Sequence, residues 1–128
     1  FDRFKLINDS LGHAAGDAVL VEAARRIEQT VRNSDLAARV GGDEFLVLLS
    51  ETDPATAVQT AHRIVEVLNQ PYAATSSPVT GSAGVALFPQ HGATLEALCR
   101  AADRALYAAK SDGRARVNTA DPGLVTAL

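Results

Sequence analysis

Two short apolar runs, residues 36–40 and 45–49, lie on either side of a pair of glycines, and this arrangement constrains the fold more than any other feature. Apolar runs joined across two glycines are typical of a β-hairpin, because glycine accepts positive φ at both positions of a two-residue turn. We therefore expect two antiparallel strands here, with Gly41 and Gly42 forming the turn between them.

Apolar residues recur at helical spacing on both sides of this hairpin. We expect helices over residues 4–11, 17–31, 53–70 and 94–112, and further strands within 79–87 and 114–117. The last helix should place Tyr107 in the core and turn an apolar stripe inward, made of Leu95, Leu98, Ala102, Leu106 and Ala109. This order of elements predicts an α+β (α/β-like) fold, a mixed, mostly antiparallel central sheet flanked by helices.

Composition indicates one domain, expected over residues 1–118, with a linker over 119–128. The formal net charge of −3 argues against a protein that coats nucleic acid, which needs a basic face, but allows a small anionic ligand. The single cysteine, Cys99, cannot form an internal disulfide and is consistent with a reducing, cytoplasmic location. No run approaches the ~20 apolar residues of a membrane span, so we expect no direct membrane contact.

The run Gly41-Gly42-Asp43-Glu44 concentrates the chemistry of the chain. Glycines remove side-chain bulk, so a phosphate could approach the main chain at Gly42, and two carboxylates supply hard oxygen ligands. This pattern suits a magnesium-phosphate site. A plain polar turn is the alternative interpretation.

A second group lies near the start of the chain. Lys5 falls in the first turn of a helix whose free N–H groups could face a phosphate, while Asn8 and Asp17 offer the donors and acceptors that read a purine edge. His13 lies between them and is counted with this substrate-binding set, although a structural or surface role suits it as well. Asn8 and Asp17 could instead satisfy helix ends.

Two further pairs have equally ordinary alternatives. Lys110 and Arg114 bracket the end of the last helix, where they could hold a triphosphate or only complement the helix dipole. Arg32 and Asp35 form an Arg-x-x-Asp turn before the hairpin, which by itself suits a solvated loop.

Taken together, these motifs resemble the GGDEF family of diguanylate cyclases in order and spacing over about residues 1–118. The resemblance rests on four runs: Asp2-Arg3-Phe4-Lys5-Leu6-Ile7-Asn8-Asp9, then Gly12-His13 with Gly16-Asp17, then Gly41-Gly42-Asp43-Glu44-Phe45, and last the segment from Ala102 to Lys110. It implies a nucleotide-cyclase-like fold that condenses two GTP molecules into cyclic di-GMP and releases pyrophosphate. It also implies Mg²⁺ or Mn²⁺ as cofactor and a homodimer, because each domain holds one GTP.

The resemblance assigns roles to residues near the acidic turn. Asp43 would bind the metal and, with Glu44 as the other candidate, accept the proton of the attacking 3′-hydroxyl. Asn8 and Asp17 would bind guanine, and Lys5 would stabilise the transition state.

Other residues would hold the phosphates or the product. The main-chain N–H groups around Arg3 and Phe4 would bind phosphate together with Lys110 and Arg114. The Arg-x-x-Asp turn would bind cyclic di-GMP and cause feedback inhibition. Arg63, on the third helix, could be the secondary arginine of that site or part of a solvated face.

The chain departs from the family pattern at its first residue. The family motif begins with a strand that ends Asp-x-Asp, and Phe1 occupies the x position, so the first aspartate, a metal ligand in the family, is absent. We expect the natural protein to continue upstream with that strand. Within this sequence only the main-chain carbonyl of Phe1 represents that half of the metal site.

Two other functions stay open at this point. The domain could bind GTP without cyclising it, as a regulatory module of a larger protein with sensor or EAL-type phosphodiesterase domains. It could also be a pure product receptor acting through Arg32 and Asp35, although the intact Asp43-Glu44 pair argues against this.

Overall fold

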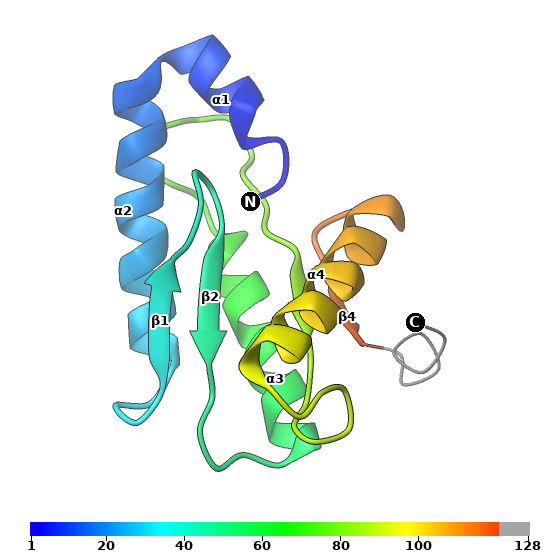
Figure 1. The fold of residues 1–128 in the computed structure, drawn as a ribbon. Coiled ribbons are helices and arrows are strands. Elements are labelled where there is room, and N and C mark those ends of the chain that lie inside the picture. The colour runs from blue at the N-terminus through cyan, green and yellow to red at the C-terminus, as the bar shows by residue number, and fades with distance from the viewer. Residues whose placement is uncertain (121–128) are drawn as a thin grey trace.

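The computed structural model describes residues 1–120, so most of the predicted linker, 121–128, lies outside the described residues. The elements follow the predicted order and confirm the α+β class. They are α1 (Phe4–Leu11), α2 (His13–Thr30), β1 (Leu36–Arg39), β2 (Phe45–Leu48), α3 (Pro54–Leu68), β3 (Ala83–Val85), α4 (Leu95–Ser111) and β4 (Val117–Thr119). As Figure 1 shows, α2 runs beside the hairpin and α4 lies on its other side.

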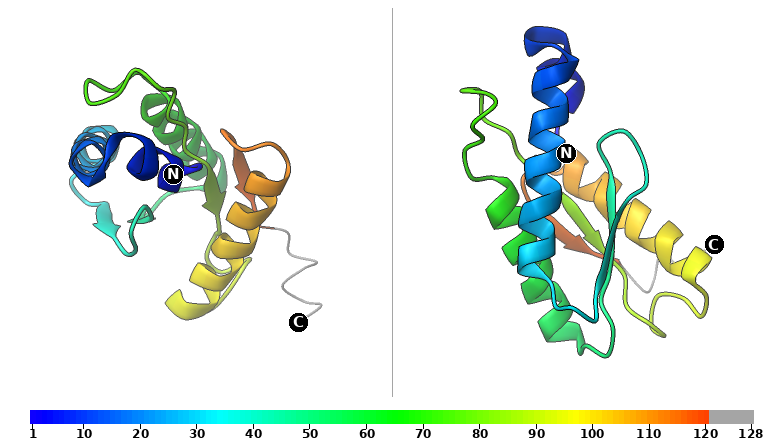
Figure 2. Two further views of the ribbon diagram at one scale, coloured as in Figure 1. Left: turned by 90° about the horizontal axis from the view of Figure 1, so that it is seen from above. Right: turned by 90° about the vertical axis from the view of Figure 1, so that its left-hand side faces the viewer.

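The four strands form two separate pairs within the described residues. β1 and β2 pair antiparallel, with Leu36 opposite Leu48 and Arg39 opposite Phe45. β3 and β4 pair in parallel, and α4 packs against both. The first two residues connect the two pairs at one end: the Phe1 nitrogen donates to the Asp43 carbonyl before β2, and the Asp2 N–H donates to the Thr80 carbonyl before β3 (Figure 2).

The predicted two-residue turn is wrong. Neither Gly41 nor Gly42 has a φ in the left-handed region, and the connection between the strands is five residues long, 40–44. It closes because the Val40 N–H donates to the Glu44 carbonyl at 3.0 Å. A longer loop of this kind needs no positive φ at its tip.

Helix boundaries follow the capping chemistry. Asp53 and Thr94 cap α3 and α4 as predicted, their side chains accepting from the N–H groups of Thr56 at 2.7 Å and Ala97 at 3.1 Å. Gly12 ends α1 with φ 88°, as expected. However, α2 begins at His13 and not at Asp17, because the chain turns at Gly12 and re-enters a helix at once.

Two expectations for the C-terminal third of the chain are wrong. Ala109 of the expected inward stripe is buried and Leu98, Ala102 and Leu106 are half-buried, but Leu95 is 54% exposed and Tyr107 is 76% exposed, while Ala101 and Ala105 are buried. Small residues suit this face because α4 lies close to the backbone at Gly84, whose hypothetical Cβ would fall 2.1 Å from the Ala102 carbonyl oxygen. The last strand begins at Val117 and not at 114, because residues 114 and 115 take left-handed conformations.

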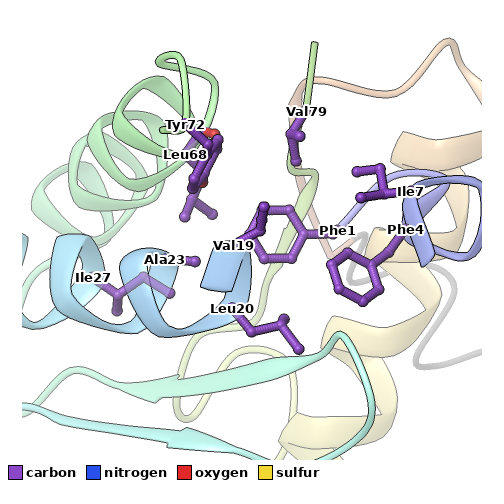
Figure 3. Packing of buried hydrophobic residues seen from close by; sticks show 10 residues of the cluster. All are labelled: Phe1, Phe4, Ile7, Val19, Leu20, Ala23, Ile27, Leu68, Tyr72 and Val79. Carbon is purple, nitrogen blue, oxygen red and sulfur yellow. The ribbon is translucent and has the colours of Figure 1, made fainter. Parts of the chain in front are cut away.

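Phe1 lies at the centre of the main core. Its ring stacks on Phe4 at 5.9 Å between centroids and meets Tyr72 edge-on at 6.2 Å and Phe45 at 6.5 Å. Figure 3 shows the ring between α1 and α2, with Val19 behind it and Leu20 turned toward the hairpin. Because the first residue is anchored by aromatic packing, the main-chain groups on either side of it hold a defined position.

Candidate functional site

Phe1 joins the acidic hairpin tip to the end of α4. Its nitrogen donates to the Asp43 carbonyl at 2.8 Å, and its own carbonyl accepts from Lys110 Nζ at 2.9 Å. The right-hand view of Figure 2 shows the N-terminus beside the C-terminal end of α4, in agreement with this contact. The structure therefore brings Phe1, Asp43 and Lys110, which the sequence analysis selected separately, into one site.

The hairpin tip is shaped by Arg39, which the sequence analysis missed. Its guanidinium donates to the Gly41 carbonyl at 3.1 Å and to the Gly42 carbonyl at 2.8 Å. An arginine two residues before a glycine pair was the available signal, because it can reach forward to carbonyls that glycine leaves uncovered. With both carbonyls satisfied, the loop presents Asp43, which is half-buried, and Glu44, which is exposed.

The donors at this tip fit a hard divalent cation. Neither the Asp43 nor the Glu44 carboxylate has a hydrogen-bond partner within residues 1–120, and the Phe1 nitrogen contacts the Asp43 main-chain carbonyl. The same residues contain no group of three or more His, Cys, Asp or Glu that could enclose a metal. Mg²⁺ needs no such cage, since it commonly uses one or two carboxylates with waters and substrate phosphates. The residues present thus suit a site that a nucleotide completes.

The start of α1 offers unsatisfied main-chain donors. Arg3 takes a left-handed conformation, φ 55° and ψ 35°, and no side chain caps the helix. The first N–H of α1 with an acceptor is that of Leu6, which donates to the Arg3 carbonyl at 3.1 Å. The N–H groups of Arg3, Phe4 and Lys5 therefore lack an acceptor within the part of the chain that the structure describes, as an anion site at a helix N-terminus requires. Lys5 itself is exposed on the first turn.

The candidate guanine ligands come from two helices packed closely together. A Cβ added to Gly16 would fall 1.9 Å from Asn8 Oδ1 and 3.1 Å from Phe4 Cζ, so the Asn8 side chain lies directly on α2. Asp17, the next residue, is exposed inside α2 and caps no helix. The capping interpretation of Asp17 is therefore wrong. His13, the first residue of α2, is exposed and makes no side-chain hydrogen bond within residues 1–120.

Asp17 also borders an open groove of about 500 Å³ between α2 and the hairpin. The groove is lined by Asp17, Leu20, Val21, Ala24, Ile27, Glu28, Ala37, Ala38, Arg39 and Phe45. Seven of these ten residues are apolar, and Asp17, Glu28 and Arg39 are charged. Asn8 is not part of this lining and lies against Gly16, the neighbour of Asp17.

The end of α4 carries the candidate phosphate cations. Lys110 lies in its last turn, half-buried against the Phe1 carbonyl. Arg114 follows in a left-handed conformation with φ 65°, and its N–H donates to the Ala109 carbonyl at 3.0 Å. Such a conformation costs a non-glycine residue about 1–2 kcal/mol. The turn after α4 is therefore held by its surroundings.

Asp2 is a second residue that the sequence analysis did not select as a site residue. It is 5% exposed, and its carboxylate accepts hydrogen bonds from Thr80, Ser82 and Ala115. Burial opposes ionisation, but these hydrogen bonds and the charge of Lys110 outweigh it and hold the Asp2 pKa below its ordinary value. A buried carboxylate with this many donors stays ionised near neutral pH.

The Arg-x-x-Asp turn is closed on itself. The Asp35 carboxylate, 2% exposed, accepts from Arg32 N at 2.9 Å and from Ser50 N at 3.1 Å, and the Arg32 guanidinium also reaches it. The hydrogen bond with Arg32 lowers the Asp35 pKa from its ordinary value. The Arg32 side chain is 55% exposed, so part of its guanidinium faces solvent.

Arg63 lies apart from this turn. It is exposed on α3, and its one described side-chain hydrogen bond within residues 1–120 is to Thr60 on the same helix at 3.5 Å. The structure does not bring it into contact with Arg32 or Asp35.

The arrangement of helices and strands is that of the nucleotide-cyclase-like α+β class. Within that class the chain belongs to the GGDEF domain family, because the family profile described as "Diguanylate cyclase, GGDEF domain" matches residues 1–116. No helix within residues 1–120 is both long and apolar enough to pass through a bilayer.

Curated relatives and solved structures agree with this membership. The chain is 46% identical over 117 residues to diguanylate cyclase TpbB of Pseudomonas aeruginosa, covering 88% of this chain and 27% of that protein. It is 44% identical over 115 residues to the bifunctional diguanylate cyclase/cyclic di-GMP phosphodiesterase MucR of the same species, covering 88% and 17%. Cyclic di-GMP phosphodiesterase NbdA, also from that species, is 40% identical over 115 residues, covering 88% and 15%. The chain thus spans less than a third of each of these relatives.

Among solved structures, a shortened TpbB comprising only the GGDEF domain matches with TM-score 0.87 and 44% identity, covering 99% of this chain and 77% of that one. The GGDEF domain of DgcB from Caulobacter crescentus, solved in complex with c-di-GMP, matches with TM-score 0.81 and 31% identity, covering 92% and 72%.

Proposed function

We propose that this chain is the catalytic domain of a diguanylate cyclase, which condenses two GTP molecules into cyclic di-GMP and releases two pyrophosphates. The observation that carries the proposal is the position of Phe1, whose two main-chain groups contact Asp43 at the hairpin tip and Lys110 at the end of α4. Main-chain contacts of Phe1 thus link the hairpin tip that carries the two acidic residues to the cationic end of α4.

In this proposal the nucleotide is held along its length. Asn8 and Asp17 bind guanine. The free N–H groups of Arg3 and Phe4, the main chain at Gly42, and the side chains of Lys110 and Arg114 bind the phosphates. His13, the exposed first residue of α2, stays in the substrate-binding set of this proposal.

The chemical step is an in-line displacement. The 3′-hydroxyl oxygen of one GTP forms a bond to the α-phosphorus of the other, the bond to pyrophosphate breaks, and the proton passes to Asp43 or Glu44. Lys5 offsets charge that builds on the phosphoryl oxygens. Mg²⁺ or Mn²⁺ held by Asp43 and the Phe1 carbonyl would supply further charge neutralisation. Each domain holds one GTP, so two domains must face each other, and we propose a homodimer.

Regulation belongs to the same proposal. The exposed part of the Arg32 guanidinium, with Asp35 and with Arg63 as a secondary contact, binds cyclic di-GMP and inhibits the enzyme. The chain would act in the cytoplasm, within a larger protein that carries sensor or EAL-type domains.

A silent, GTP-binding regulatory module is the second candidate. It is favoured by one relative, NbdA, which is named for phosphodiesterase activity alone.

One experiment separates the two candidates. The protein, expressed from its natural start to its natural stop, is incubated with Mg²⁺ and GTP, and products are resolved by liquid chromatography with mass detection. Cyclic di-GMP and pyrophosphate are expected from the wild type and from Glu66→Gln, an exposed acid on α3, and neither product from Asp43→Asn. GTP binding without turnover in the wild type would establish the regulatory module instead.

A further inference from the structure

The Asp2 carboxylate connects three segments that are distant in sequence. Its Oδ2 accepts from Thr80 Oγ1 at 2.7 Å and from the Ala115 N–H at 3.1 Å, while its Oδ1 accepts from Ser82 Oγ at 2.7 Å. Its own N–H donates to the Thr80 carbonyl at 2.9 Å. The turn before α1, the segment before β3 and the turn after α4 therefore meet at one buried side chain.

Two of these segments carry the candidate phosphate ligands. Arg3 follows Asp2 directly in the chain, and its N–H has no acceptor within residues 1–120. Its backbone takes the left-handed conformation with φ 55°. Arg114 and Ala115, on the far side of the carboxylate, are left-handed with φ 65° and 49°. Non-glycine residues rarely adopt this region, so contacts from outside the turns must hold them there. The hydrogen bond from Ala115 to Asp2 is a contact of this kind.

We propose that Asp2 is a positioning residue of the phosphate site, whose carboxylate holds the turn before α1 against the turn after α4. In this arrangement the N–H groups of Arg3 and Phe4 and the side chain of Arg114 approach one triphosphate together. The inference rests on the proposed function, because it assumes that a nucleoside triphosphate binds here. Asp2 itself touches no substrate.

Hydrogen-bond chemistry distinguishes two substitutions at this position. Asp2→Ala removes all three acceptor contacts and leaves the Ala115 N–H without a partner. Asp2→Asn can keep its amide oxygen toward Thr80 and Ala115, and its NH₂ toward Ser82, because a hydroxyl can turn from donor to acceptor. The asparagine variant should therefore preserve the turn geometry that the alanine variant loses.

The test measures the affinity of 3′-deoxy-GTP, which cannot be cyclised, and of guanosine, which lacks phosphates, by NMR titration with Mg²⁺ present. For Asp2→Ala we expect the 3′-deoxy-GTP affinity to fall at least about tenfold and the guanosine affinity to stay within about twofold. For Asp2→Asn both affinities should stay within about threefold of the wild type. An unchanged 3′-deoxy-GTP affinity in Asp2→Ala, or an equal loss for guanosine, would overturn the proposal.

Asp53→Ala is the matched control. Asp53 also accepts a main-chain N–H, that of Thr56 at 2.7 Å, but it does so at the start of α3 and away from the phosphate ligands. The Asp53→Ala substitution should lower the free energy of unfolding without loosening either turn. The affinities for 3′-deoxy-GTP and for guanosine should therefore stay near those of the wild type. If Asp2→Ala does not fold, Thr80→Val combined with Ser82→Ala removes the two hydroxyl contacts and should give the same selective loss.

A second measurement separates this inference from the proposed function. Amide hydrogen exchange at Ala115 is followed without nucleotide in the wild type and in Asp2→Ala. Exchange at least about tenfold faster in the variant shows that Asp2 holds the turn, whereas equal exchange overturns the inference even if GTP is cyclised. Failure of the wild type to bind 3′-deoxy-GTP, with faster exchange in the variant, would reject the proposed function and, with it, the phosphate role.

Discussion

Lys110 Nζ donates to the carbonyl oxygen of Phe1 at 2.9 Å, across 109 positions of sequence. The cation expected to bind phosphate is thus paired with the carbonyl expected to bind the metal. An ammonium has three donors and a carbonyl oxygen two lone pairs, so each group keeps capacity for a ligand. The pair therefore holds the two halves of the candidate site together and leaves both open.

Replacing Lys110 should weaken nucleotide binding. Lys110→Met keeps most of the side-chain volume but removes the charge, so GTP affinity should fall about tenfold or more, as expected for loss of a charge-assisted contact. Isothermal titration with 3′-deoxy-GTP measures this. Arg100→Ala, on the same helix and paired with Glu96 at 2.9 Å, is the control and should bind normally. Equal affinity in both variants would contradict a phosphate role for Lys110.

Adding a methyl group at Gly16 should damage both the helix packing and the base site. The new Cβ would fall 1.9 Å from Asn8 Oδ1, so α1 must move or Asn8 must leave its position. We expect Gly16→Ala to cost about 1–3 kcal/mol in the free energy of unfolding and to weaken guanosine binding. Urea titration measures the first effect. Gly42→Ala, whose Cβ would meet nothing within 4 Å, should unfold like the wild type.

The hydrogen bonds that the Asp35 carboxylate accepts from Arg32 and Ser50 should make the free energy of unfolding depend on pH in the acid range. Because the hydrogen bond with Arg32 lowers the pKa of folded Asp35, the ionised carboxylate stabilises the fold above its unfolded pKa of about 3.9. This contribution is lost as the pH falls through the lower, folded pKa. Wild type should therefore be more stable than Asp35→Asn at about pH 6, and the difference should shrink below about pH 4. Urea titrations of both proteins at several pH values measure this difference. A difference that stays constant with pH would contradict a stabilising role of the ionised Asp35 carboxylate.

Removing the Arg32 side chain should relieve product inhibition. Arg32→Ala deletes the exposed guanidinium but no group of the catalytic site, so the inhibition constant for cyclic di-GMP should rise at least about tenfold while initial rates change less than about twofold. Initial-rate assays with added product measure both. Arg25→Ala, an exposed arginine on α2, should be inhibited like the wild type. If cyclic di-GMP inhibits Arg32→Ala as strongly as the wild type, Arg32 is not part of the site of feedback inhibition.

Local signals in the sequence determined the order of the elements and the acidic turn. Capping side chains such as Asp53 and Thr94 act within one turn of a helix, and apolar spacing acts within one element, so neighbouring residues carry the information. The acidic turn, the cations after the last helix and the motif resemblance selected Asp43 and Lys110, but residue types and spacing say nothing of contact between them.

Tertiary structure alone decided how these parts meet. Phe1, Asp43 and Lys110 lie far apart in sequence, and no periodicity predicts their contact. The hydrogen bonds from Thr80 and Ala115 to Asp2 span 78 and 113 positions, so the role of that carboxylate could not be found locally. Likewise, α4 buries Ala101 and Ala105 and leaves Leu95 and Tyr107 exposed, which the helical spacing of apolar residues did not predict. Long-range packing selects among side chains that local preferences treat as equivalent.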